Sequence, residues 1–257
     1  MIIWLASYPK SGNTWVRLFL NSLINDKTNE VDINNIQIRQ FPLRYDFSNL
    51  NIDMDNIQEF ISNCILCQDK INLDNSIKIF KTHNAFWKAG NNQFTNEENT
   101  KGVIHIVRDP RNIITSVKNH FSRKNYDEAL KFMTDEKKSL GSRIKKKDTD
   151  LPTVVSSWSN HYKSWKKMKK NYLLIKYENL LNNPKDEFVR EFRSSLRLRP
   201  ELVGCETWEE VFGGTQDRRL WVHRHRDPLR YKSEINSFRY IMSRDQFSDF
   251  ERSMTKL

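Results

Sequence analysis

The sequence has few of the residues that build disulfide-linked or turn-rich folds. Its 257 residues include three cysteines, seven glycines and seven prolines. Three cysteines do not make a disulfide scaffold in a chain of this size, and so few glycines and prolines argue against a repeat of turn-rich strands. No apolar run approaches the roughly 18 residues of a membrane-spanning helix, and no basic region precedes the first apolar stretch as in a signal peptide. We therefore expect a single domain over residues 1–257 in a reducing, cytoplasmic setting.

Positive charge, in contrast, is abundant. Lysine and arginine number 43 against 32 aspartate and glutamate residues, a formal net charge of +11. An excess of this size suits an anionic partner, either a nucleic acid or a polyanionic nucleotide. Much of the excess lies in lysine runs such as residues 145–147 and 166–170, and runs of this kind are usually solvated faces. Charge by itself therefore does not separate the two kinds of partner.

The cysteine spacing does not indicate a metal centre. Cys64 and Cys67 have C-x-x-C spacing, but they lie in an apolar helical pattern. No second ligand pair follows, because Cys205 stands alone and no two histidines have metal spacing. We predict buried free thiols and no bound metal.

The first 24 residues join a short apolar run, a tight polar loop and an amphipathic helical pattern. Residues 2–5 suit a buried strand, Pro9 and Gly12 punctuate the loop, and Asn13 or Thr14 can cap the helix that follows. The loop brings backbone N–H groups and Lys10 to a helix N-terminus, which is a ready site for phosphate. It is not a Walker A loop, because Lys10 precedes Gly12 instead of following a glycine.

Short apolar segments alternate with helical patterns along most of the chain. This alternation predicts an α/β protein with a P-loop-like three-layer fold, in which helices flank a central parallel sheet. The expected strands cover residues 2–5, 76–80, 102–107 and 171–176, and the expected helices cover residues 16–24, 55–70, 110–121, 126–139, 154–169 and 184–196.

Three polar motifs directly follow three of these strands. They are the loop at residues 8–15, His83, and Arg108 with the residues after it. Ligands of open parallel sheets bind at the carboxyl ends of the strands, so all three motifs are expected to face one crevice. There, the imidazole of His83 can take a proton from an attacking hydroxyl, and Arg108 can bind a phosphate through its forked guanidinium. Ser116, one to two turns into the next helix, can join Arg108 on the same ligand.

These motifs resemble those of the cytosolic-type sulfotransferases, which use 3′-phosphoadenosine 5′-phosphosulfate (PAPS). The sequence YPKSGNTW at residues 8–15 is similar to the 5′-phosphosulfate loop of that family, and the spacing of Arg108 and Ser116 matches its 3′-phosphate site. Lys-Thr-His at residues 81–83 resembles its catalytic segment, although the family often continues with Leu-Pro where this chain has Asn84-Ala85. We expect that departure to affect the acceptor wall more than the base.

The resemblance implies transfer of a sulfuryl group from PAPS, without a metal, to a hydroxyl or amine of a small-molecule or glycan acceptor. His83 would be the general base, and Lys10 would stabilise the leaving phosphate. Trp15, Tyr177 and Trp208 would form the slot for adenine. The full set of residues implied in donor binding is Lys10, Ser11, Gly12, Asn13, Thr14, Trp15, Arg108, Ser116, Tyr177, Trp208, Arg230 and Lys232.

The resemblance weakens after about residue 200. Where the family has a glycine-containing loop that closes over the 3′-phosphate, residues 230–239 lack both glycines, although Arg230 and Lys232 remain. The basic cluster at residues 218–226 has no counterpart, and it suits an acidic acceptor or a solvated face equally. Sugar, phenol, lipid and small alcohol all stay open as acceptors, and the oligomeric state is equally open.

Two other functions are compatible with the composition. A P-loop nucleotide kinase would bind its nucleotide with Mg²⁺, but the expected strand at 102–107 ends in Arg108 instead of a Walker B aspartate. A non-catalytic nucleic-acid-binding protein would bind with a steep salt dependence. The sequence contains nothing that resembles a recognition helix or an aromatic RNA-binding sheet, so nucleic acid is not expected as a partner. No membrane span is expected either, because no apolar run is long enough.

Overall fold

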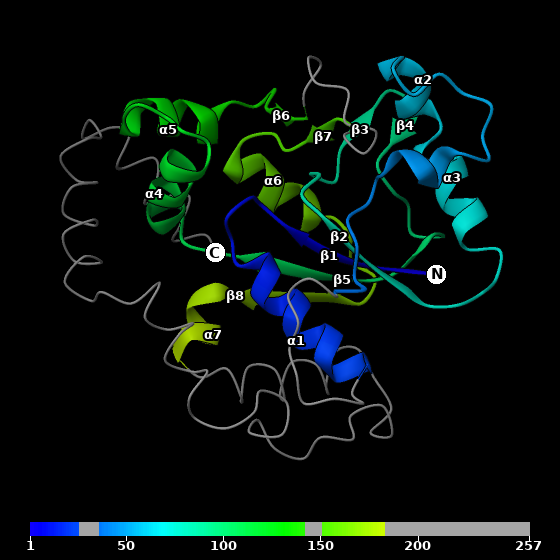
Figure 1. Ribbon diagram of the computed structural model, residues 1–257, viewed down its shortest axis with the longest axis horizontal. Coiled ribbons are helices and arrows are strands. Elements are labelled where there is room, and N and C mark those ends of the chain that lie inside the picture. The colour runs from blue at the N-terminus through cyan, green and yellow to red at the C-terminus, as the bar shows by residue number, and fades with distance from the viewer. Residues whose placement is uncertain (26–35, 142–150, 183–257) are drawn as a thin grey trace.

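A four-stranded parallel sheet forms the centre of the computed structural model, which describes residues 1–25, 36–141 and 151–182 (Figure 1). The strand order is β2-β1-β5-β8, and every neighbouring pair is parallel. The strands are β1 (Ile2–Ser7), β2 (Lys78–Thr82), β5 (Thr100–Val107) and β8 (Tyr172–Lys176).

Helices cover both faces of this sheet, so the predicted three-layer α/β fold is confirmed. Figure 1 shows α1 and α7 on one side of the sheet and α6 on the other. The helices are α1 (Asn13–Asn25), α2 (Ile57–Ser62), α3 (Cys64–Ile71), α4 (Pro110–His120), α5 (Tyr126–Thr134), α6 (Trp158–Trp165) and α7 (Tyr177–Asn182). Short elements complete the described part: η1 (Arg44–Phe47), β3 (Lys88–Ala89), β4 (Asn92–Gln93), β6 (Ser139–Leu140) and β7 (Thr153–Val154).

The alternation of side chains along β1 divides the core. Ile3 and Leu5 pack in the cluster that contains α1 residues, whereas Ile2 and Trp4 pack in the cluster on the opposite face. All of β1 is buried, because a parallel sheet with helices on both faces leaves neither side of a central strand in water. This explains why residues 2–5 read as a continuous apolar run.

The order of the strands also determines where a ligand binds. From β1 the chain passes to β2 on one side, and β5 and β8 then lie on the other side of β1. The carboxyl ends of β1 and β5 therefore flank a topological switch point, which is where open α/β sheets bind their ligands. Residues 8–12 follow β1 and residues 108–109 follow β5, so both reach this point.

Three expected helices are shorter than predicted, and the one expected at 126–139 ends as α5 at Thr134, before β6 begins at Ser139. The pattern at residues 55–70 divides into α2 and α3, because Asn63 has ψ of 5° and its side chain donates to the carbonyl oxygen of Glu59 (2.8 Å). The pattern at 154–169 becomes helical only at Trp158, after β7 and a capping hydroxyl on Ser157. The apolar spacing continues past the capping residues Asn63 and Ser157, so apolar periodicity overestimated the lengths of these helices. The helix expected at 184–196 lies outside the described residues.

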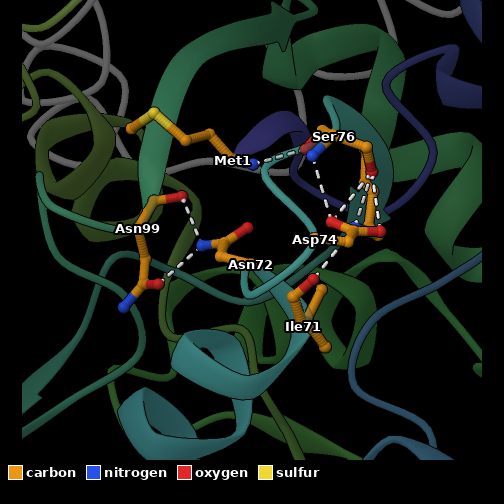
Figure 2. A network of polar contacts seen from close by, with 7 residues as sticks. Met1, Ile71, Asn72, Asp74, Ser76 and Asn99 are labelled. Carbon is orange, nitrogen blue, oxygen red and sulfur yellow. Dashed lines mark hydrogen bonds and ion pairs between the residues drawn. The ribbon is translucent and has the colours of Figure 1, made fainter.

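A polar network fixes the opposite, amino-terminal end of the sheet (Figure 2). The amino group of Met1 donates to the carbonyl oxygen of Ser76 (2.5 Å), and Asn72 donates to the side-chain oxygen of Asn99 (2.6 Å). Asp74 accepts hydrogen bonds from Ser76 and forms an ion pair with Lys78, and these contacts lower the pKa of Asp74 to about 2. This network ties the starts of β1, β2 and β5 together, far from the switch point.

The two cysteines within the described residues are buried and free, as predicted. Cys64 and Cys67 are both 0% exposed, and burial raises the pKa of the Cys64 thiol to about 12. A thiol with so high a pKa is protonated at neutral pH, so it is a poor nucleophile. Cys205 lies outside the described part of the chain. Within the described part, no helix is both long and apolar enough to cross a lipid bilayer.

Candidate functional site

The loop between β1 and α1 is an unusual turn. Lys10 has φ of +71° and Gly12 has φ of +94°, so two backbone units lie in the left-handed region within three residues. For a lysine this conformation costs on the order of 1–2 kcal/mol, and such strain is concentrated at functional sites. Helix α1 then begins at Asn13, and Trp15 N–H donates to the carbonyl oxygen of Gly12 (3.1 Å).

Asn13 does not have the capping role that its position suggests. Its side-chain amide donates backwards to the hydroxyl of Ser7 (3.0 Å) and to the carbonyl oxygen of Leu5 (3.3 Å). Asn13 thus attaches the start of α1 to the end of β1. The prediction of an Asn13 cap was wrong, because a buried amide between two elements pairs with the nearer strand instead of with its own helix.

Gly12, Tyr177 and Arg108 pack on one another at the centre of the site. A Cβ atom on Gly12 would lie 2.3 Å from Cδ2 of Tyr177, so the ring lies directly on the glycine. The guanidinium of Arg108 covers the same ring, with Cζ 4.4 Å from its centroid, and Trp15 meets Tyr177 edge-on at 6.2 Å. The structure therefore brings together Gly12, Trp15, Arg108 and Tyr177, which the sequence analysis predicted to bind the same nucleotide.

Arg108 and Lys10 carry positive charge that no described carboxylate neutralises. Arg108 donates to the carbonyl oxygen of Lys10 (3.2 Å), while its buried Nε has no partner among the described residues. Burial lowers the pKa of Lys10, and the nearby Arg108 lowers it further. Within residues 1–25, 36–141 and 151–182, no carboxylate forms an ion pair with either side chain. Two uncompensated cations beside a helix N-terminus form an anion site.

The loop hydroxyl of Ser11 fits the same ligand. It is 0% exposed, and its oxygen has no hydrogen-bond partner in the described part of the chain. Buried hydroxyls normally have a partner, so an unpaired one beside two cations suits a phosphate oxygen. Thr14 lies exposed on the first turn of α1, and Ser116 lies half-buried on α4. No described hydrogen bond joins Ser116 to Arg108.

His83 follows β2 and reaches across to the end of β1. Its Nδ1 lies 2.7 Å from the carbonyl oxygen of Ser7 and 3.2 Å from the Ser7 hydroxyl. Because a carbonyl oxygen only accepts, Nδ1 carries the proton and Nε2 keeps its lone pair. Burial holds the pKa of His83 well below its usual 6.5, with Lys81 as the next contribution. His83 is therefore a neutral imidazole with one fixed tautomer at pH 7.

Sequence reasoning missed Lys81 as a site residue. Its Nζ donates to Oε1 of Gln40 (2.8 Å), and burial with the nearby Arg17 lowers its pKa to about 8. A signal was present, because Lys81 stands two residues before the candidate base at the end of a predicted strand, where a buried cation costs free energy unless it is paired. Sequence reasoning also missed Ser7, whose backbone oxygen selects the tautomer of His83.

Several predicted site residues cannot be placed. Trp208, Arg230, Lys232 and the basic cluster at residues 218–226 lie outside the described residues. Contacts connect the loop, Arg108 and Tyr177 at the carboxyl ends of β1, β5 and β8, and His83 contacts the end of β1 at Ser7. No described contact joins Thr14 or Ser116 to this group. Fold and site thus define an α/β protein with two cations, Lys10 and Arg108, and a neutral imidazole at the carboxyl end of its sheet.

The chain belongs to the sulfotransferase domain family, whose model matches residues 2–193. Its similar proteins include mouse (Mus musculus) sulfotransferase 1 family member D1, 25% identical over 218 residues, with 78% of this chain and 61% of the relative covered. Dog (Canis lupus familiaris) sulfotransferase 1B1 is 25% identical over 232 residues, covering 83% and 64% of the two chains. The chain spans less than two thirds of the length of either relative.

A solved structure supports the fold independently. The crystal structure of retinol dehydratase in complex with androsterone and the inactive cofactor PAP superposes with a TM-score of 0.51 at 15% identity. The match covers 99% of this chain and 80% of the other. At that identity the likeness concerns the fold alone, and it agrees with the parallel sheet described above.

Proposed function

We propose that this protein transfers a sulfuryl group from PAPS to a hydroxyl or amine of a small-molecule or glycan acceptor. The observation that carries this proposal is that His83 contacts the last residue of β1 through Ser7, while Lys10 and Arg108 contact each other in the loop that directly follows β1. The retinol dehydratase structure holds PAP and a small molecule, which supports the choice of donor and acceptor class.

In the proposed reaction, Nε2 of His83 takes the proton of the acceptor hydroxyl. The acceptor oxygen forms a bond to sulfur while the bond from sulfur to the 5′-phosphate oxygen breaks. The electron pair of that bond stays on the phosphate, and 3′,5′-diphosphoadenosine (PAP) leaves. Lys10 and the N–H groups at the start of α1 lie where this negative charge develops, so they stabilise the transition state more than the ground state.

The remaining contacts of the donor follow from the packing of the site. Arg108, whose guanidinium has no carboxylate partner in the described residues, is proposed to bind the 3′-phosphate together with Ser116. Tyr177 and Trp15 lie edge to face and offer an aromatic slot for adenine. Gly12 lets the loop backbone approach both Tyr177 and the phosphate. Thr14, exposed on the first turn, completes the 5′-phosphate contacts.

A thermal-shift assay tests the donor. At about 100 times its Kd, PAP is expected to raise Tm by roughly 5–10 °C, since ligation at that level stabilises a protein by about 2.7 kcal/mol. ATP and ADP are expected to give smaller shifts, because they lack the 3′-phosphate. The shift with PAP is expected to be the same with Mg²⁺ or with EDTA. A shift with ATP that requires Mg²⁺ would instead favour the kinase alternative.

The pH profile of kcat/KM tests the two perturbed groups. The acid limb is expected well below pH 6, because the base His83 is protonated only below its lowered pKa. The alkaline limb is expected near pH 8, because Lys81 then loses the positive charge that acts on His83. Activity should fall about tenfold between pH 7 and pH 9.

Two lysine variants make this prediction specific. Lys81→Met should lower activity at pH 7 and remove the alkaline limb. Lys78→Met, on the same strand but at the end that pairs with Asp74, should keep the wild-type profile. An unchanged alkaline limb in Lys81→Met would refute the role of Lys81 in the profile.

A further inference from the structure

The segment directly after His83 is held by hydrogen bonds that involve one buried side chain. Asn84 is 2% exposed. Its side-chain oxygen accepts from the N–H of Val154 (2.8 Å) and from Nε1 of Trp87 (3.4 Å). Its backbone oxygen accepts from Nε1 of Trp165 (2.8 Å), and its backbone N–H donates to the hydroxyl of Thr82 (3.0 Å). A single residue thus connects the end of β2 to β7 and α6.

The two residues after Asn84 extend the same attachment. Ala85 N–H donates to the carbonyl oxygen of Val154 (2.7 Å), and Phe86 N–H donates to the hydroxyl of Ser164 (2.9 Å). The backbone that follows His83 is therefore held by these hydrogen bonds, while the imidazole ring is held by the carbonyl oxygen of Ser7.

We propose that Asn84 is a positioning residue, which holds the backbone of His83 so that Nδ1 meets Ser7 and Nε2 faces the acceptor. This inference rests on the proposed function, because it takes His83 as the base. Asn84 itself touches neither donor nor acceptor in this role. It acts through the direction of the imidazole, and a base displaced by about 1 Å can lose about 100-fold in rate.

The departure from Leu-Pro in the resembling family supports this assignment. A leucine at position 84 has no acceptor for the N–H of Val154, and a proline at position 85 has no N–H for the Val154 carbonyl oxygen. Both hydrogen bonds to Val154 thus depend on the Asn84-Ala85 pair of this chain. We therefore connect this departure with the base, whereas the sequence led us to expect an effect on the acceptor wall.

The charged and titratable groups around His83 come from other elements. Lys81 lies on β2, Arg17 on α1 and His161 on α6, and each lowers the pKa of His83. Burial keeps His161 neutral, with a pKa of about 3. None of these groups contacts the side chain of Asn84 through a described hydrogen bond, although His161 interacts with the backbone of His83 and Asn84. We therefore expect a change at the Asn84 side chain to act first on the orientation of His83.

The test is Asn84→Leu, measured in two ways on the full chain. We expect kcat to fall about 10- to 100-fold, with KM for PAPS within about twofold of wild type, because the donor residues lie on other loops. The tautomer of His83 is measured by ¹⁵N NMR of protein labelled at histidine, and the His83 signals are assigned by their absence in His83→Asn. In the wild type these signals should show the Nδ1–H tautomer. Asn84→Leu should show a mixture of tautomers.

Asn72→Leu is the matched control, because Asn72 also makes amide hydrogen bonds but at the far end of the sheet. It should keep kcat and the His83 spectrum. Should Asn84→Leu fail to fold, Ser164→Ala removes one hydrogen bond from the same segment and should lower kcat about 3- to 10-fold.

Either of two results overturns the proposal. One is a folded Asn84→Leu or Ser164→Ala variant in which the His83 tautomer and kcat are both unchanged. The other is a loss of kcat in Asn72→Leu as large as the loss in the tested variant. Absence of PAPS-dependent transfer in the wild type would refute the proposed function instead. In that case the imidazole spectra would still decide whether Asn84 orients His83.

Discussion

His83→Ala is expected to lower kcat by about 10²- to 10⁴-fold, the usual contribution of a general base, while PAP binds as tightly as to the wild type. The reason is that the proposed base and the proposed phosphate-binding groups lie on different elements of the fold. The proposed phosphate-binding groups belong to the loop after β1 and to Arg108, whereas His83 comes from the end of β2. Sulfuryl transfer measured with labelled PAPS, together with calorimetric titration of PAP, checks both halves of the prediction.

His83→Asn separates the base from its structural contact. An asparagine amide at this position can still donate to the carbonyl oxygen of Ser7, but it has no basic nitrogen. Its activity should therefore be as low as that of His83→Ala, with the wild-type Tm retained. Full activity in either variant would refute the assignment of His83 as the base.

Gly12→Ala is expected to weaken PAP binding by at least about 100-fold, because two effects add at one atom. The backbone at φ +94° disfavours any side chain, at a cost of about 1–3 kcal/mol. The new methyl group would also lie 2.3 Å from Cδ2 of Tyr177, whose ring also packs against the guanidinium of Arg108. Tyr177 must therefore move. Its movement disrupts the proposed aromatic slot for adenine and also displaces Arg108, the proposed ligand of the 3′-phosphate. Calorimetric titration of PAP measures the loss.

Gly90→Ala provides the control for backbone strain. Gly90 also has a positive φ, +61°, but a Cβ there meets nothing within 4 Å. Gly90→Ala should therefore lower Tm slightly and leave the affinity for PAP unchanged. If both variants bind PAP equally well, the contact between Gly12 and Tyr177 does not build the nucleotide site.

The loop at residues 8–15 was readable from sequence because its signals are local. A glycine that needs a positive φ, a lysine and the start of a helix lie within a few residues, and β1 before it is an uninterrupted apolar run. The convergence of the loop, His83 and Arg108 was also predictable, since parallel strands present their carboxyl ends at one edge. Helix boundaries were less predictable, because capping by Asn63 and Ser157 interrupts apolar patterns that continue past them.

The roles of Ser7, Lys81 and Asn84 required tertiary structure. The tautomer of His83 depends on a carbonyl oxygen 76 positions away in the chain, and Asn84 is connected to a backbone N–H 70 positions away. A sequence pattern does not encode such contacts, because any residue can supply a carbonyl or an N–H. Position within the fold decides which one does.

The sequence by itself determined the α/β architecture, the phosphate loop and the identity of the candidate base, because strand and helix periods and short-range turn chemistry are written into neighbouring residues. Only the tertiary structure decided how that base is oriented, which cations lack a carboxylate partner, and that Tyr177 lies on Gly12 beneath Arg108. These properties depend on burial and on contacts between distant segments, and packing creates both when the sheet and its helices come together.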